Sequence, residues 1–386
     1  MVPISYNLRN LKVRKTTSAA AAFGLALVVF VFASVLMLSN GIQKTLGRSA
    51  SSDVAIVLRK GATAEIESVI EESSVNLVLN DTALPAPASG PRGVSELVVV
   101  ILLDKIGASG VSNAQVRGIS PDTLAFRSSV KIVEGRAAQQ GSDEVVIGKA
   151  VAGRFKGLSL GESFELKKNR PVKVVGIFAD GGSSLESEVW ADIDTVRTSF
   201  KREGYTSAVR VRVQPAAFDA YKTSIESNRQ LNMQVLKESE YFDKQSEGTA
   251  MFITALGIMI AVFFSIGAML GAMITMHGAV ANRQREIGTL RALGFSKTSI
   301  LFSFLLESII LSIIGGGIGA IASLAMGFVS FSMVNFASWS EIVFRFEPEA
   351  GVIVGSMIFA SVMGLVGGFL PAIRASRINP IEAMRA

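Results

Sequence analysis

The residues that carry most enzyme chemistry are scarce in this chain. It contains no cysteine and one histidine, His277, which excludes thiolate metal sites, iron–sulfur clusters and cysteine nucleophiles. One histidine cannot make a metal site, and the sequence holds no GxSxG nucleophile motif. The nearest approach to a GxxxxGK[ST] phosphate loop is Gly294–Thr298 (GFSKT), whose lysine lacks the adjacent glycine. The sequence therefore predicts a non-catalytic chain that binds no metal or cofactor.

Four apolar runs are each long enough to cross a bilayer, which takes about 20 residues. They predict transmembrane helices at 16–39, within 247–280 (together with the end of a stalk), at 299–329 and at 350–370. A water-exposed domain, 40–246, would separate the first helix from the second. The segments 281–298 and 330–349 would be a cytoplasmic connection and an opposite loop. This pattern predicts a multi-pass membrane protein.

The basic residues predict its orientation, because Lys and Arg concentrate in short cytoplasmic segments. They gather in the tail 1–15, in 281–298 and in the tail 371–386, and comprise Arg9, Lys12, Arg14, Lys15, Arg283, Arg285, Arg291, Lys297, Arg374, Arg377 and Arg385. The loop 330–349 is acidic instead. Both termini are therefore expected in the cytoplasm, and the 40–246 domain on the other side.

The net charge of +6 does not indicate nucleic-acid binding. Residues 41–246 hold 26 Lys and Arg against 25 Asp and Glu, so the domain itself is nearly neutral. The excess positive charge flanks the membrane spans, where topology accounts for it.

The 40–246 domain is predicted to be α+β, with two lobes. A first lobe, about 50–106 and 205–237, has a strand at Asp53–Leu58, a helix at Ala64–Glu72 and a strand at Val75–Leu79. With the later elements the order is β-α-β-β-α-β, that of a split, ferredoxin-like unit. The insert, about 107–204, is rich in short strands between glycine turns.

The connection between the second and third spans mixes apolar and charged side chains. Such a segment suits a cytoplasmic partner, because apolar knobs dock in a groove while the surrounding charges set the register. We expect the coupling residues to be Arg283, Arg285, Glu286, Ile287, Leu290, Arg291, Leu293 and Gly294. Gly294 suits a helix end and Ser296 the cap of the next helix. The alternative is a solvated basic loop.

These motifs resemble the permease subunits of the MacB/LolE/FtsX-like ABC transporter superfamily. The resemblance rests on Arg285–Gly288 (REIG), Leu290–Gly294 (LRALG), Gly315–Gly319 (GGGIG) and the C-terminal Pro371–Ala383. In the 40–246 domain, Val116–Ile119 (VRGI), Glu134–Arg136 (EGR) and Glu144–Gly148 (EVVIG) are similar to the MacB-type periplasmic domain.

The resemblance implies a homodimer in a bacterial inner membrane, bound to a separate pair of ATPase subunits that hold ATP and Mg²⁺. Force from the ATPases would reach the periplasmic domain by mechanotransmission and drive export or extraction, with a periplasmic adaptor or acceptor as a further partner. The alternative is an FtsX-like regulator that signals to a cell-wall hydrolase without transport.

Three features within the spans leave alternatives open. Glu307 is either an ion-pair partner or switch for a nearby arginine, or a residue near the headgroups. Gly267 and Gly271, like Gly315 and Gly319, allow close helix packing within or between protomers. The second span and its stalk, if helical from about Glu240 to Arg285, would measure roughly 65–70 Å.

Overall fold

The computed structural model describes residues 9, 15–84, 90–107 and 110–385. Lys12 and Arg14 of the predicted tail lie outside these residues. The chain forms two units. The helical unit comprises Met1–Asn40, Met251–Val329 and Phe346–Ala386, and the sheet unit comprises Gly41–Ala250 and Ser330–Arg345.

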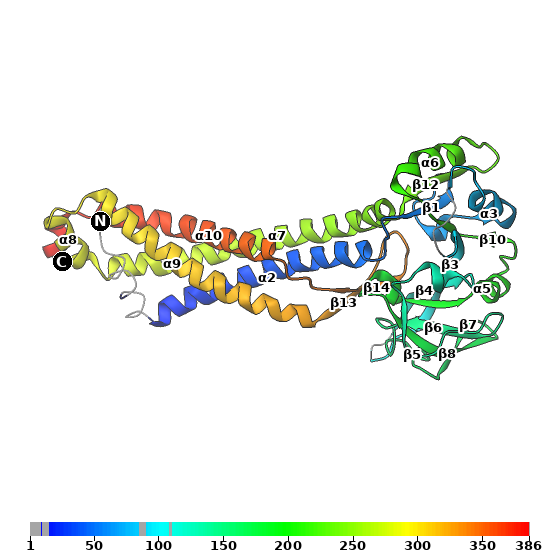
Figure 1. Ribbon diagram of the computed structural model, residues 1–386. Helices are drawn as coiled ribbons and strands as arrows, with labels where there is room; N and C mark the ends of the chain where they lie inside the picture. Colours follow the sequence, from blue (N-terminus) through cyan, green and yellow to red (C-terminus); the bar gives the residue numbers. More distant parts are fainter. Residues whose placement is uncertain (1–8, 10–14, 85–89, 108–109, 386) are drawn as a thin grey trace. The chain divides into compact units, whose positions relative to one another are not determined.

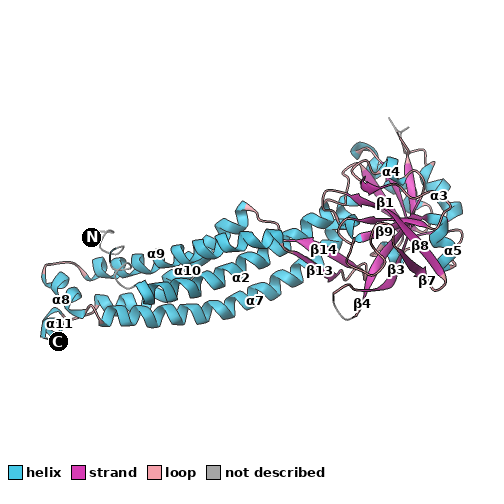
Figure 2. Ribbon diagram, turned by 90° about the horizontal axis from the view of Figure 1, so that it is seen from below, coloured by secondary structure: helices cyan, strands magenta, loops and turns pink. Residues whose placement is uncertain are grey.

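Four long helices of the described chain are apolar enough to span a membrane (Figures 1 and 2). They are α2 (Lys15–Gly47), α7 (Glu238–Ala281), α9 (Lys297–Leu324), which a 3₁₀ turn η4 (Ala325–Phe328) prolongs, and α10 (Ala350–Ser376). Residues 371–376 were predicted to be tail, but α10 continues to Ser376. Pro371 is buried within it, as neighbouring helices in a membrane protein allow.

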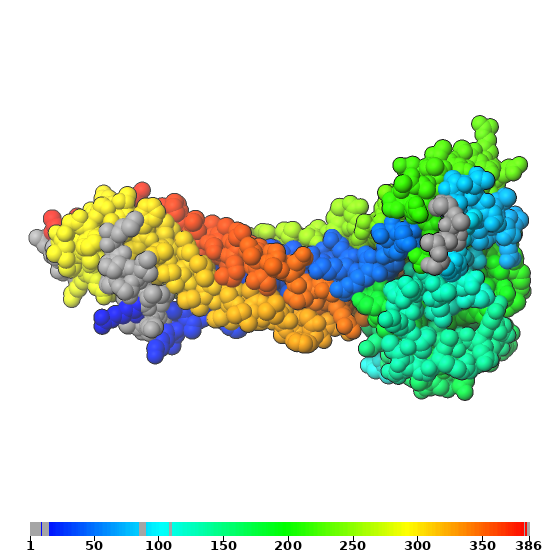
Figure 3. All heavy atoms as spheres, viewed as in Figure 1, coloured from blue at the N-terminus to red at the C-terminus, as the bar shows by residue number. Residues whose placement is uncertain are grey.

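Small residues let α9 and α10 pack closely along each other, and the two surfaces adjoin in Figure 3. A Cβ added at Gly316 of α9 would lie 2.5 Å from Ala360 of α10, and one at Gly368 would contact Ser308. Van der Waals packing and interhelical hydrogen bonds, such as that from the Ser308 hydroxyl to the Gly364 carbonyl, attract helices to each other in lipid. Two short helices, α8 (Gln284–Ala292) and α11 (Pro380–Arg385), complete the unit.

The first half of the sheet unit has the predicted split, ferredoxin-like order. Its strands β1 (Val54–Arg59), β3 (Gly93–Asp104), β11 (Ala208–Arg212) and β12 (Met233–Lys237) pair antiparallel in the order β12-β1-β11-β3. The helices α3 (Glu72–Leu79) and α6 (Phe218–Ser227), which a 3₁₀ turn η3 (Pro215–Ala217) precedes, supply side chains to the same hydrophobic core. β11 lies between β1 and β3, and β1 between β11 and β12, so two βαβ halves interlock.

Two local predictions in this half were wrong. Residues 64–72 do not form the expected helix but a 3₁₀ turn η1 (Glu65–Glu67) and a short strand β2 (Ile70–Glu71), which pairs with β10 (Tyr205–Thr206). The expected strand at Val75–Leu79 lies in α3. Val75 and Val78, three residues apart, are buried on one helical face, whereas β-branched Val69 and Ile70 favour extended backbone.

The second half continues the same sheet, because β3 also pairs along its length with β4 (Val111–Ile119). Ten of the described strands form this sheet, in the order β12-β1-β11-β3-β4-β9-β6-β8-β5 with β7 paired to β8. The remaining elements are α4 (Thr123–Phe126), β5 (Lys131–Gly135), β6 (Glu144–Gly148), β7 (Ser163–Lys167), β8 (Arg170–Ala179), η2 (Ser184–Ser187), β9 (Glu188–Asp192) and α5 (Ile193–Phe200). A second hydrophobic core fills this half.

The segment predicted as a plain loop, 330–349, contains a β-hairpin. Its strands β13 (Ser330–Val334) and β14 (Glu341–Arg345) pair in regular register. The hairpin belongs to the sheet unit although the chain reaches it from α9 and leaves it into α10. Asn335 holds the turn, accepting hydrogen bonds from the backbone of Ala337 and Ser338.

Candidate functional site

The predicted coupling segment contains the helix α8 and the short connections that join it to α7 and α9. Two residues separate α8 from the end of α7. Gly294 has a φ of 96°, the left-handed conformation that glycine adopts without strain. The hydroxyl of Ser296 accepts a hydrogen bond from the backbone N–H of Ser299 and caps α9. The helix end and the cap predicted from the sequence are both confirmed.

The structure divides the eight predicted coupling residues into an inner and an outer set. Arg283 and Ile287 are buried, Leu290 and Arg291 are half-buried, and the outer set is exposed: Arg285, Glu286, Leu293 and Gly294. Leu293 is 73% exposed. The inner residues fix α8 to the helical unit, so only the outer set forms a surface in this conformation.

The buried face of α8 is held by three other helices. Ile287 shares a core with Phe304 of α9 and with Ala372 and Ala375 of α10. A Cβ added at Gly288 would lie 2.7 Å from the Cβ of Ala383 in α11. A displacement of α8 would therefore displace α9, α10 and α11, because close-packed interiors transmit strain.

Arg283 links this segment to the intramembrane carboxylate. Its Nη1 lies 3.1 Å from Oε2 of Glu307, and its Nε lies 3.1 Å from Oε2 of Glu286. Its guanidinium also lies over the ring of Phe304, 5.2 Å from the centroid. Glu307 is 5% exposed. The structure thus forms the ion pair that the first alternative for Glu307 required.

The two glycine pairs have different surroundings. A Cβ at Gly315 would lie 2.6 Å from the backbone oxygen of Ala22 in α2, and one at Gly319 would contact Ala26. This pair joins α9 to α2 within one protomer. A Cβ added at Gly267 or Gly271 of α7 would have no atom of the described residues within 4 Å, outside its own helix backbone and chain neighbours. These two line an apolar groove of about 440 Å³ beside α2.

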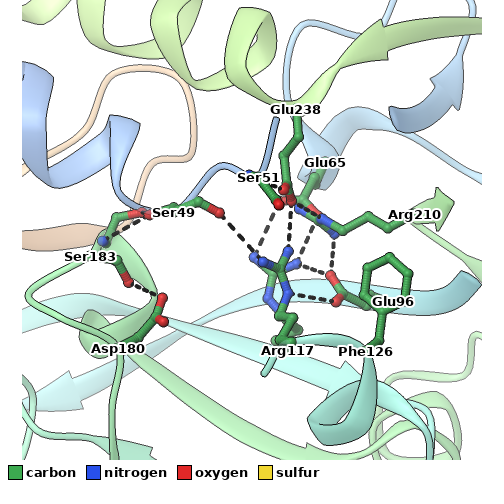
Figure 4. A network of polar contacts seen from close by, with 12 residues as sticks. Ser49, Ser51, Glu65, Glu96, Arg117, Phe126, Asp180, Ser183, Arg210 and Glu238 are labelled. Atoms are coloured by element: carbon green, nitrogen blue, oxygen red, sulfur yellow. Dashed lines mark hydrogen bonds and ion pairs between the residues drawn. The ribbon is translucent and has the colours of Figure 1, made fainter. Parts of the chain in front are cut away.

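The sheet unit contains a buried charged cluster that the sequence analysis did not identify (Figure 4). Arg117 of β4 donates from Nε to Glu188 and from Nη1 to Glu65, and each donor–acceptor distance is 2.7 Å. It also pairs with Glu96 of β3. Arg210 of β11 pairs with Glu96 and Glu65. Neighbouring strands with opposite charges at inward positions were the sequence signal for this cluster.

The cluster extends to the first turn of α7. The carboxylate of Glu238 accepts three hydrogen bonds. They come from Arg210 Nε (2.7 Å), Arg127 Nη2 (2.8 Å) and the backbone N–H of Ser51 (2.9 Å). Its carboxylate at the helix start also interacts favourably with the helix dipole. The Oη of Tyr241, one turn later, accepts from the backbone N–H of Glu65. Sheet, α7 and the segment after α2 are therefore joined by one set of buried charges.

The arginines change the ionisation of the buried carboxylates. Burial alone would raise the pKa of Glu65, but Arg117 and Arg210 overcome this effect and hold it well below the usual 4.5. The pKa of Glu96 is lowered despite burial for the same reason, with Arg210 as the larger influence. Both carboxylates therefore remain charged near neutral pH.

The hairpin β13–β14 has its own polar contacts within the sheet unit. The carboxylate of Glu341 lies 2.6 Å from Nζ of Lys105 and 3.1 Å from Nη2 of Arg154. Burial raises the pKa of Glu341, but hydrogen bonds from Lys105 and Ser112 outweigh this and keep it below 4.5. The backbone N–H of Val343 donates to the Ser187 hydroxyl. These contacts attach the hairpin to β4 and η2.

Two family models match the chain. The MacB-like periplasmic core domain matches residues 18–227, more than half of the sequence, and the FtsX-like permease C-terminal domain matches residues 258–380. The chain belongs to the MacB-like family of ABC transporter permeases. The predicted family and fold class are thereby confirmed.

Members of this family from distant organisms align with most of the chain. The macrolide export ATP-binding/permease protein MacB of Bdellovibrio bacteriovorus is 26% identical over 98% of this chain and 60% of its own length. The uncharacterized ABC transporter permease MJ1507 of Methanocaldococcus jannaschii is 24% identical over 99% of this chain and 97% of its own. A solved periplasmic region of MacB from Actinobacillus actinomycetemcomitans is 14% identical, with a TM-score of 0.38, over 50% of this chain and 92% of that one.

Proposed function

We propose that the chain couples ATP hydrolysis by a separate pair of ABC ATPase subunits to movement of its 40–246 domain, and so drives export or extraction of a substrate. ATP and Mg²⁺ belong to the ATPases in this proposal. The chain acts as a homodimer in a bacterial inner membrane, with both termini in the cytoplasm and a periplasmic adaptor or acceptor as a further partner.

The observation that carries this proposal is the division of α8 into a fixed face and an exposed face. Ile287 and Gly288 fasten α8 to three other helices, while Leu293 and Arg285 remain exposed beside its C-terminal and N-terminal ends. An exposed leucine among charged residues suits docking into an apolar groove of a partner. Force on this surface would reach α9 and α10 through the shared core.

The helix α7 supports the same role. Its 44 residues form one continuous helix of about 66 Å at 1.5 Å per residue. It begins at Glu238, within the charged cluster of the sheet unit, and ends two residues before α8. A helix that is held at its first turn by buried ion pairs can transmit a movement along its axis.

Leu293→Ala tests the docking surface. The full chain is co-purified with the Walker-motif ATPase proposed as its partner, and ATP hydrolysis is measured in lipid. We expect the variant to lose ATPase capture by about tenfold, the size expected when one buried apolar anchor is truncated. Ile321→Ala, which removes a 71% exposed side chain of α9, is the matched control and should change nothing.

Unchanged capture by Leu293→Ala would contradict the docking surface. Regulation without transport is the other class of function, and it has its own outcome. In that case the complex hydrolyses ATP normally and activates a cell-wall hydrolase, but no substrate leaves the membrane. This result would support the regulatory function and contradict export.

A further inference from the structure

The second half of the sheet curls around its core but leaves a gap in the circle of strands. The consecutive neighbours β3, β4, β9, β6, β8 and β7 all place alternate side chains in one hydrophobic core, as in a small, partly open barrel. The two ends of this run are β3 and β7, and their residues line one groove of about 670 Å³. This volume lies within the roughly 300–1,000 Å³ of typical binding pockets.

Both strands turn backbone hydrogen-bonding groups toward this groove. In β3 the carbonyl groups of Glu96 and Asp104 bond to Ser207 and Lys156, away from β4. The β3–β4 register is regular between these residues, so Val100 and Leu102 face the same way by the two-residue period. β11 pairs with β3 only at 93–96, and the described residues place no other strand beside Val100 and Leu102.

The edge of β7 that faces the groove also turns backbone groups away from its neighbouring strand, β8. Glu165 lies opposite Pro171 of β8, which has no N–H to donate, and the N–H of Val174 bonds to the carbonyl of Glu162. The backbone of Ser163 and Glu165 therefore points away from β8 and toward the groove. On each strand, two of the described residues thus turn backbone donors and acceptors toward one groove, an arrangement that β-sheet proteins ordinarily cover or block.

The groove also selects for charge and shape. Lys167 and Lys168 lie along it with one carboxylate, Glu165, while Lys156 is ion-paired with Asp104, its Nζ 3.3 Å from Oδ2. Leu102 is 67% exposed on the outer side of β3. A ligand that presents apolar and acidic side chains in alternation would match these groups on its two faces.

We propose that this groove binds an extended, acidic and apolar peptide segment of another protein, which adds a strand between β3 and β7. Since β3 and β7 run antiparallel to each other through the pairings of the sheet, the added strand is antiparallel to one and parallel to the other. A second copy of this chain fits less well, because the outer edge strand β5 carries a bulge at Ile132–Glu134, which hinders edge-to-edge pairing.

Fluorescence anisotropy of the full chain in lipid nanodiscs tests this binding with a labelled eight-residue peptide of alternating valine and glutamate. We expect saturable binding that is abolished when alternate residues of the peptide are N-methylated, because methylation removes one row of donors. Leu102→Pro removes an exposed leucine side chain and an N–H that points into the groove rather than to β4, so the fold should be retained. This variant should bind roughly three- to tenfold more weakly, whereas Leu102→Ala keeps the N–H and should lose less.

Charge reversal provides the second arm. Lys167→Glu with Lys168→Glu should transfer preference from the valine–glutamate peptide to a valine–lysine peptide. Absence of saturable binding, equal loss in Leu102→Pro and Leu102→Ala, or insensitivity to N-methylation would overturn the proposal. If the variants change only the mass of the particle by light scattering, the edge joins copies of this chain, and the proposal of a foreign peptide is wrong.

Discussion

At the scale of residues, the buried charges of the sheet unit decide how its parts hold together. Arg210 is fully buried and pairs with Glu65, Glu96 and Glu238. Bringing such ions out of water costs several kcal/mol each, so the cluster is stable only while all partners are present.

Arg210→Met should destabilise the sheet unit by about 3–5 kcal/mol, because it removes one of the counterions of three buried carboxylates. The midpoint of thermal unfolding of the full chain in detergent measures this change. The matched control is Arg136→Met, whose arginine is half exposed in its pair with Glu144 and should leave the midpoint unchanged. Equal effects of the two substitutions would mean that the cluster contributes no more than a surface ion pair.

Acidification should weaken the same cluster. The pKa of Glu65 is lower in the folded chain than its usual 4.5, so the folded state binds this proton less readily than the unfolded state. The resulting stability is fully present above pH 4.5 and is lost as the pH falls below that value.

Unfolding midpoints from pH 7 to pH 3 should therefore fall in the wild-type chain. Glu65→Gln should be less stable at pH 7 but flatter across this range. Parallel curves for the two proteins would place the acid sensitivity elsewhere.

At the scale of elements, the two glycine pairs of α9 and α7 differ, because another helix of the described chain packs on the pair in α9 and none packs on the pair in α7. Gly315 and Gly319 pack on α2, which resolves their alternative in favour of contact within one protomer. Gly267 and Gly271 border an open groove on α7, the least buried of the four spans at 17%. Small residues that open such a face are typical of contacts between protomers.

In the proposed homodimer, Gly267→Leu with Gly271→Leu should separate the two protomers, because leucine side chains prevent the close approach of two α7 helices. Particle mass in detergent by light scattering is the measurement. Gly278→Leu, on the same helix and also with open space around it, should remain dimeric. A double variant that stays dimeric would move the interface to another face.

At the scale of the whole molecule, the sheet unit is built from two distant parts of the chain. Residues 41–250 and the hairpin 330–345 belong to it, so chain connections from all four long helices enter this unit. Glu341 and its partners Lys105 and Arg154 hold the second part to the first.

The absence of cysteine in the sequence allows the orientation to be tested with single cysteines. Ser129→Cys in the sheet unit should react with an impermeant maleimide added outside intact bacterial spheroplasts, and Thr289→Cys in α8 only after lysis, as the positive-inside rule requires. Both positions are exposed, so accessibility of the side chain does not bias the comparison. Labelling of Thr289→Cys before lysis would reverse the topology.

The sequence by itself determined the four spans, the order β-α-β-β-α-β, the C-terminal end of α8 and the cap of α9. These follow from local rules, since run length, side-chain period and capping residues act over a few positions. Local rules also produced the errors at 64–79, where both helix and strand patterns fitted and the pairing of β2 with β10 decided.

Only the tertiary structure decided which charges meet. Arg117 lies 52 residues from Glu65 and 71 from Glu188, and a strand pattern marks each as polar without naming its partner. The same holds for Arg283 with Glu307 and for the open edges of β3 and β7. Ion pairs and sheet edges depend on distances between segments that are remote in sequence, and these distances are fixed only when the strands and helices pack.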